Sequence, residues 1–314
     1  MKKIQCLVFA FAVCLFPFFG VSSVSADEQK AQEDVLVDIP TKKIDKLPRI
    51  QNMGDIKPIR KVNTTSIEEF KKKEGLEVKP DRNQDVQQAI DPPIGIQATW
   101  ERITNTKQAP YNGVVSLYVF YDDYIVGCAG SMIDPTSVLT AAHCIYDTYS
   151  NTLAEAVLVV PGENPSDGSP YGSAMGTEVA FTTNWKDVKP PNPDQVRYTD
   201  IRFDYAVVNV DPEDRFPVFT FTMRSSVSDS EKVTASGYPN EYQYKSVGNI
   251  TDYDRLFEVI NNNTRTEPGM SGGPLWNTTG VGTTQIGINS AKGDNKSMAC
   301  PLDETTKKLI QSWQ

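Results

Sequence analysis

Residues 137–144 read Ser-Val-Leu-Thr-Ala-Ala-His-Cys, an apolar stretch that ends beside the one histidine of this 314-residue chain. Residues 137–141 have the Val, Leu and Thr content of a β-strand. Similar short runs recur from about residue 97 onward, separated by Gly, Pro, Asn and Asp. These further runs cover residues 113–120, 156–160, 205–210, 232–236 and 285–288. Many short strands with little helical periodicity predict an all-β protein, built as a sandwich or a pair of barrels.

The C-terminus is the exception to this β pattern. Asp303 is a residue type that caps helices, and the following residues place Thr306, Leu309, Ile310 and Trp313 on one helical face. We therefore expect a C-terminal helix whose apolar face packs against the rest of the protein.

The N-terminal residues indicate export. Two lysines precede an apolar run over about residues 4–21, and small residues follow before Asp27. This pattern predicts a secretory signal peptide over residues 1–26. A membrane anchor is the alternative, but Pro17 interrupts a run that is already shorter than the roughly 20 apolar residues of a spanning helix. We expect a secreted, extracellular protein that has no membrane contact after the signal is removed.

Residues 27–95 differ in composition from the rest, with many Lys, Asp, Glu and Gln and few aromatics. A segment of this kind cannot bury much apolar surface by itself. We predict a poorly structured pro-segment that is removed on maturation, with a disordered spacer as the alternative. The globular domain then covers residues 96–314.

Composition also restricts the partners. The formal net charge is -9, which repels nucleic acid and anionic lipid, so neither is an expected partner. Metal clusters draw on several histidines, and this chain has only His143. We expect no metal or organic cofactor.

His143 follows directly on the apolar strand that ends at residue 141, and a strand end is rigid. General-base catalysis needs an imidazole fixed within hydrogen-bond reach of a nucleophile, although a lone histidine is more often structural. Cys128 and Cys144 flank the strand, and disulfides persist in exported proteins, so we expect a bridge worth about 3 kcal/mol. Cys300 is then a free thiol, unless it forms an intermolecular disulfide or the three cysteines pair differently.

One serine has glycines on both sides, in the stretch Gly-Met-Ser-Gly-Gly over residues 269–273. Glycines let backbone amides approach a developing oxyanion, so the N–H groups of Gly269 and Ser271 are candidate oxyanion donors. A surface turn is the alternative, and the pattern also fits the nucleophile turn of α/β hydrolases. Those enzymes need a histidine after the serine, and none follows Ser271. The order of His143 and Ser271 is that of the chymotrypsin-type triad.

The third member of such a triad is a buried acid that orients the histidine. Asp204 directly precedes the apolar run over residues 205–210 and is our candidate. Asp200 lies four residues earlier in a more polar setting and is the fallback. For both residues, the alternative is an ordinary solvated acid in a loop.

In this order, TAAHC at 140–144, DYAVV at 204–208 and GMSGGP at 269–274 resemble the trypsin-like serine proteases. CAGSMI at 128–133 and GYP at 237–239 are similar to the bacterial glutamyl endopeptidase, or V8-like, branch. The resemblance covers about residues 97–314.

The resemblance implies two antiparallel six-stranded β-barrels, over about residues 96–212 and 213–314, with the triad in the cleft between them. The implied activity is that of a monomeric serine endopeptidase acting on protein or peptide substrates. His143, Asp204 and Ser271 are its implied catalytic residues. A catalytically inactive secreted binding protein or adhesin on the same fold is the alternative, and a covalent fluorophosphonate probe separates the two.

Four positions near the serine bear on activation and specificity. Met270 stands where trypsin-type zymogens keep an Asp that pairs with the new N-terminus, so any activation works differently. Glutamyl relatives bind the substrate carboxylate with a Thr that Thr266 matches and a His that Asn289 replaces, which weakens a charge-assisted contact. Arg265 favours acidic side chains at the residue before the cleaved bond (P1) if it points into the pocket, and has no such role if it points to solvent.

Overall fold

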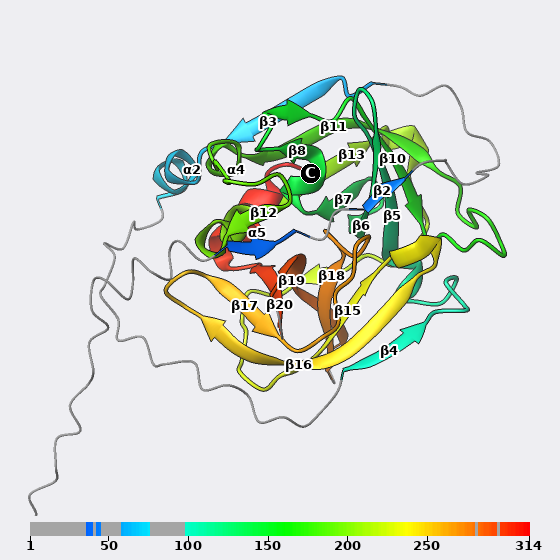
Figure 1. Ribbon diagram of the computed structural model, residues 1–314. Helices are drawn as coiled ribbons and strands as arrows, with labels where there is room; N and C mark the ends of the chain where they lie inside the picture. Colours follow the sequence, from blue (N-terminus) through cyan, green and yellow to red (C-terminus); the bar gives the residue numbers. More distant parts are fainter. Residues whose placement is uncertain (1–35, 40–41, 45–57, 76–97, 280–281, 294–295) are drawn as a thin grey trace, which may run out of the picture.

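The computed structural model describes residues 36–39, 42–44, 58–75, 98–279, 282–293 and 296–314. The predicted signal peptide and most of the predicted pro-segment lie outside the described residues. Two antiparallel β-barrels make up the domain (Figure 1). This is the fold that the family resemblance implied.

The first barrel closes from six antiparallel strands in the order β10-β5-β6-β7-β13-β11, with β11 pairing back to β10 (Figure 1, green). Its strands are β5 (Val114–Phe120), β6 (Ile125–Asp134), β7 (Ser137–Thr140), β10 (Ala156–Pro161), β11 (Ala174–Thr182) and β13 (Ala206–Val210). The four strands predicted in this half of the domain are confirmed, each with ends within one residue.

The second barrel also closes from six strands, in the order β15-β16-β17-β20-β19-β18, with β18 pairing back to β15 (Figure 1, yellow to red). Its strands are β15 (Lys232–Gly237), β16 (Tyr244–Asp254), β17 (Val259–Asn262), β18 (Pro274–Thr279), β19 (Gly282–Lys292) and β20 (Ser297–Pro301). The alternation expected of a barrel strand is clear in β15, where Val233 and Ala235 face the core.

Shorter elements lie at the ends and edges of the barrels. They are β4 (Thr99–Arg102), β8 (Tyr146–Asp147), β9 (Thr152–Leu153), β12 (Gln195–Arg197), β14 (Thr222–Met223), α3 (Ala142–Ile145), α4 (Thr183–Lys186), η1 (Tyr111–Gly113), η2 (Tyr198–Phe203), η3 (Pro212–Asp214) and η4 (Pro239–Glu241). Strand β4 pairs with β16 of the second barrel, although it precedes the first barrel in the chain. The six strands of the first barrel nevertheless all precede the six of the second, so β4 is the edge strand that crosses from one half of the sequence to the other.

The C-terminal helix α5 (Glu304–Gln311) forms as predicted. The Asp303 side chain accepts a hydrogen bond from the Thr306 amide at 2.6 Å, which satisfies one of the free N–H groups of the first turn. The four residues of the predicted apolar face are all buried. The Trp313 ring stacks on Tyr205 of the first barrel, with centroids 5.9 Å apart. The helix that follows the second barrel thus packs back onto the first.

The described parts of the predicted pro-segment are attached to the barrels. They are β1 (Leu36–Asp38), β2 (Lys42–Ile44), β3 (Lys61–Thr65) and α2 (Ile67–Lys73). Strand β1 lies between β12 and β19, β2 pairs with β6, and β3 pairs with β11. Val37 and Phe70 are buried against the domain. The described parts have no core of their own. They pair with stretches of β6, β11 and β19 that lack a second neighbouring strand within the barrel and so offer free backbone groups.

Candidate active site

His143 reaches the site from the end of a barrel strand. Strand β7 pairs with β13 so that Thr140 lies opposite Ala206. The residues that follow β7 and the residues that precede β13 lie at the same end of the barrel. His143 stands there in the one-turn helix α3, and Asp204 just precedes β13. Residues 61 positions apart in sequence are thereby brought together by strand register.

Asp204 is completely buried and holds the histidine at two points. Its Oδ2 lies 2.7 Å from His143 Nδ1, and its Oδ1 accepts a hydrogen bond from the His143 amide at 2.8 Å. Because a carboxylate can only accept, Nδ1 carries a proton, and in the neutral imidazole the lone pair is then on Nε2. Nε2 is buried and makes no hydrogen bond within the described part of the chain.

Ser290 is a contact of Asp204 that no sequence motif indicated. Its hydroxyl donates to Asp204 Oδ2, so the buried carboxylate has donors from two sides. The only signal in the sequence is a serine directly after Asn289, in the stretch Ile-Gly-Ile-Asn-Ser-Ala over residues 286–291. Asp200, the fallback acid, lies in η2 instead, where its carboxylate is 3.8 Å from Arg197. Burial raises the pKa of Asp200.

The Ser271 loop is fitted closely to the histidine strand. Gly272 has a φ of 81°, and a Cβ there would lie 2.1 Å from Thr140 Oγ1 and 2.8 Å from the Ala141 amide, so only glycine fits. The Ser271 carbonyl accepts from the Ala129 amide at 2.7 Å, and the Gly272 amide donates to the Asn289 carbonyl at 2.8 Å. These contacts hold the buried Ser271 between the two barrels.

Some residues around the serine hold the loop in place, and others belong to the candidate oxyanion site. The amides of Met270, Gly272 and Gly273 donate to carbonyls at 2.8–3.0 Å. Gly269 has a φ of 96°, a conformation that favours glycine. The Met270 side chain is fully buried in the core of the second barrel, with Val233 and Leu275. It is therefore a packing residue, and it offers no charge that could bind a new N-terminus.

Two of the proposed pocket residues lie in this loop and the neighbouring strand. Asn289 is fixed by its backbone, which donates to the Gly273 carbonyl at 2.9 Å and accepts from Gly272. Its side-chain Nδ2 is 3.5 Å from the Ser236 carbonyl. Asn289 Oδ1 and Thr266 Oγ1 are buried without a hydrogen-bond partner among the described residues. Buried polar atoms without partners are rare, and here they lie close to the serine loop.

The Arg265 side chain points to solvent and not into the proposed pocket. Its side chain is 54% exposed, and its Nε donates to Glu267 at 2.8 Å. The guanidinium lies over the Trp100 ring, 4.6 Å from the centroid. The charge of Arg265 is thus already paired, and we assign it no role in substrate binding.

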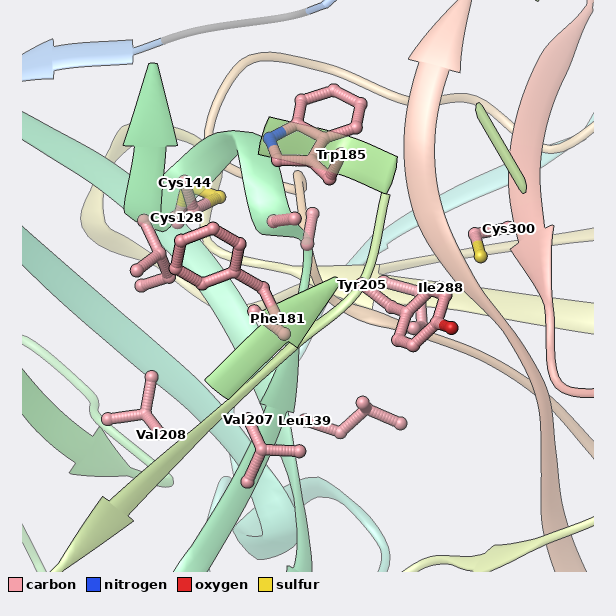
Figure 2. Packing of buried hydrophobic residues seen from close by; sticks show 14 of the residues in the cluster. Cys128, Leu139, Cys144, Phe181, Trp185, Tyr205, Val207, Val208, Ile288 and Cys300 are labelled. Carbon is pink, nitrogen blue, oxygen red and sulfur yellow. A yellow bond between two sulfur atoms is a disulfide. The ribbon is translucent and has the colours of Figure 1, made fainter. Parts of the chain in front are cut away.

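The disulfide between Cys128 and Cys144 is present, as predicted. It fixes the residue next to His143 to the middle of β6. Figure 2 shows the pair on one side of the buried cluster and Cys300 on the other. Cys300 is a buried free cysteine, and burial raises the pKa of its thiol.

Among the described residues, one group of side chains has the spacing of metal ligands. It consists of Cys128, His143 and Cys144, but its two sulfurs are joined in the disulfide.

Sequence comparison identifies the family of this domain. A model of the trypsin-like peptidase domain matches residues 128–282. A glutamyl endopeptidase of Bacillus licheniformis is 32% identical over 142 residues, 45% of this chain and 40% of that protein. A protein named extracellular metalloprotease from Bacillus subtilis is 26% identical over 220 residues, 68% of this chain and 66% of that protein. The chain thus spans less than two thirds of the length of both relatives.

Solved structures show the same fold. A glutamyl endopeptidase solved in complex with MPD superposes with a TM-score of 0.57 and 21% identity, over 70% of this chain and 98% of that one. The protease Anisep of Arthrobacter nicotinovorans gives 0.54 and 17%, over 68% and 98%. The domain is thus similar in sequence to the trypsin-like serine proteases, and it has their chymotrypsin-like fold. Within that family, it is most readily compared with the glutamyl endopeptidases, as its sequence motifs indicated.

Proposed function

We propose that this chain is a secreted serine endopeptidase that hydrolyses peptide bonds through His143, Asp204 and Ser271. The observation that carries the proposal is the set of contacts around Asp204. A fully buried carboxylate accepts from His143 at both Nδ1 and the main-chain amide, while the Ser271 loop packs on the strand that leads to this histidine. A histidine with a purely structural role would not need the Ser271 loop packed beside its strand.

The residues act as follows in this proposal. His143 Nε2 takes the hydroxyl proton as Ser271 Oγ attacks the scissile carbonyl, and Asp204 stabilises the imidazolium that forms. The amides of Gly269 and Ser271 donate to the oxyanion. The proton then passes from His143 to the leaving amine, which leaves an acyl-enzyme. His143 next takes a proton from water, whose attack releases the acid and restores Ser271.

We further propose that the pocket accepts an acidic or carboxamide side chain at P1. Thr266 Oγ1 and Asn289 are the buried polar groups without full partners beside the serine loop. A hydroxyl and an amide both donate to a carboxylate oxygen, but neither supplies a positive charge. The preference for Glu over Gln is therefore expected to be small, because a neutral donor loses the extra strength of a charge-assisted bond.

The name of the Bacillus subtilis relative points to a different chemistry, since a metalloprotease holds its metal with several side chains. In this chain the single histidine is engaged with Asp204 through Nδ1. A chelator and a fluorophosphonate probe separate these mechanisms. The serine mechanism predicts covalent labelling that is unaffected by chelation.

The first experiment is fluorophosphonate labelling of the processed, secreted protein beside Ser271→Ala. The proposal expects labelling of the wild type and loss of both labelling and peptide cleavage in the variant, with an unchanged thermal unfolding transition. Cleavage profiling on a diverse peptide library then measures the P1 preference. Absence of labelling in both samples, with residues 27–95 shown to be gone, would favour the inactive binding protein.

Secretion and maturation are part of the same proposal. No helix in the described part of the chain has the length and apolar character needed to cross a membrane. The motif of residues 1–26 supports export, and residues 27–95 are proposed to be cut off afterwards. Sequencing of the secreted N-terminus tests this, and a protein that begins at Asp27 would contradict the removal of the pro-segment.

A further inference from the structure

We infer that strands β1 and β2 of the proposed pro-segment together form an intramolecular inhibitor, because they occupy the two peptide-binding edges on either side of Ser271 that an extended substrate would use. The inference rests on the proposed function, since it concerns regulation of the same site. Figure 1 shows β1 and β2, in blue, following one another across the region between the two barrels.

Strand β1 pairs with the second barrel close to the triad. Asp38 lies opposite Lys292 of β19 in antiparallel register. Lys292 is two residues beyond Ser290, which bonds Asp204, and three beyond Asn289, which accepts from the amide after the serine. The edge that β1 occupies is therefore a direct continuation of the strand that supports Ser271.

Strand β2 pairs with the first barrel on the other side of the serine. Lys42 lies opposite Gly127 and Ile44 opposite Ile125, again antiparallel. Gly127 is followed by Cys128 of the disulfide and by Ala129, whose amide donates to the Ser271 carbonyl. This edge of β6 is thus the counterpart of the β19 edge on the opposite side.

The spacing of the two pairings is that of one continuous peptide. Asp38 and Lys42 are four residues apart in sequence, so the chain between them can span at most about 13 Å. The chain runs in a single direction through both antiparallel pairings, with residues 40–41 between them outside the described residues. Ser271 lies between the two edges because its neighbours are bonded to both of them. Strands β1 and β2 therefore flank the serine, and a substrate that binds by strand addition needs the same two edges.

The segment is also held by contacts beyond the two edges. Strand β12 forms the outer side, with Val37 opposite Val196 and the Ile39 amide bonded to the Asp194 carbonyl at 2.9 Å. Val37 and Ile39 are buried, at 6% and 9% exposure. Their burial ties the segment to the domain, so a substrate must displace it before it can pair with β19 or β6.

The test compares intact and processed protein by the rate of fluorophosphonate labelling, with the intact state verified by mass. We expect the intact chain to label at least about tenfold more slowly, because only the fraction with an open site reacts. Val37→Asp and Ile39→Pro, which remove a buried apolar contact and a donated hydrogen bond, should bring the intact chain close to the processed rate. Val62→Asp on β3 is the matched control, because Val62 is exposed and lies in the same leader, and its rate should stay slow.

A peptide of residues 34–46 added to processed enzyme provides a second test that does not depend on folding of the variants. We expect it to raise KM without changing kcat, and the same peptide with Val37→Asp to be much weaker. Equal labelling of intact and processed wild type would overturn the inference. So would slow labelling that persists in both the Val37→Asp and the Ile39→Pro variant while the peptide fails to compete. Absence of labelling in the processed protein as well would instead overturn the proposed function, and this inference with it.

Discussion

Asp204 receives hydrogen bonds from a side chain of α3, the backbone of α3 and a side chain of β19. Its carboxylate therefore links the first barrel, which carries His143, to the second barrel, which carries Ser290. A hydrogen-bonded buried acid fixes both the orientation and the tautomer of the imidazole. Substitutions at this residue should act on turnover through His143 and leave peptide binding largely intact.

Asp204→Asn is expected to lower kcat on the order of 10⁴-fold, because an amide that donates to Nδ1 selects the wrong tautomer. Asparagine has nearly the shape of aspartate, so the substitution mainly changes which ring nitrogen holds the proton. Steady-state kinetics on a peptide substrate measure the loss. Asp200→Asn is the control, and it should stay within about twofold of wild type because Asp200 contacts Arg197 instead. A large loss in the control with little change at Asp204 would reverse the assignment.

Asn289→His is expected to increase selectivity for Glu over Gln at P1 by about tenfold, since a protonated imidazole adds a charge-assisted bond to the carboxylate. The gain should be larger at pH 5.5 than at pH 8, because only the protonated ring carries the charge. Paired substrates that differ only in Glu or Gln give the ratio directly. Selectivity that does not change with this substitution would place the P1 side chain away from residue 289.

At the scale of elements, helix α5 connects the end of the second barrel to the first. Asp303→Ala should lower the free energy of unfolding by about 1 kcal/mol, because the first turn loses its side-chain cap. Asp303→Asn should stay within a few tenths of a kcal/mol of wild type, since asparagine caps equally well. Denaturant titration in the Ser271→Ala background avoids autolysis. Equal losses in both variants would mean that the charge of Asp303, not its cap, stabilises the helix.

The sequence was informative about elements wherever a local pattern carries the structure. The apolar runs marked the strands, the Asp303 cap marked α5, and the motifs around His143 and Ser271 marked the ends of strands that the fold brings together. The partner of a strand cannot be predicted from a local pattern in this way, because any strand with free backbone groups can accept a partner. Nothing in the composition of residues 36–44 indicates that they pair with β19 and β6. The contact of Ser290 with Asp204 was likewise hidden, because it depends on how the two barrels meet.

At the scale of the whole molecule, the site lies where two closed barrels meet, and neither barrel contains it alone. His143 and Asp204 come from the first barrel, whereas Ser271, Asn289 and Ser290 come from the second. The proposed inhibitor follows the same division, with β1 on the second barrel and β2 on the first. Any change that shifts one barrel against the other is therefore expected to alter catalysis and inhibition together.

Stability of the whole fold should respond to pH through buried acids near this junction. Burial raises the pKa of Asp200 above the ordinary value of 3.8, and the attraction of Arg197 opposes the shift only in part. A group whose pKa is raised in the folded state stabilises the fold when protonated, and this contribution is lost as pH rises through the folded-state pKa. Ionisation of Asp200 is therefore expected to lower the free energy of unfolding.

Asp200→Asn should accordingly raise the thermal unfolding midpoint at pH 7, and the difference from wild type should shrink toward zero as pH falls below about 4. The comparison is made from pH 3.5 to 8 in the Ser271→Ala background, with Asp123→Asn as a control at an exposed aspartate. The control should show no comparable pH-dependent gain. A lower midpoint for Asp200→Asn at pH 7 would mean that the ion pair with Arg197 outweighs the desolvation of the carboxylate, which would give Asp200 a stabilising role at the junction.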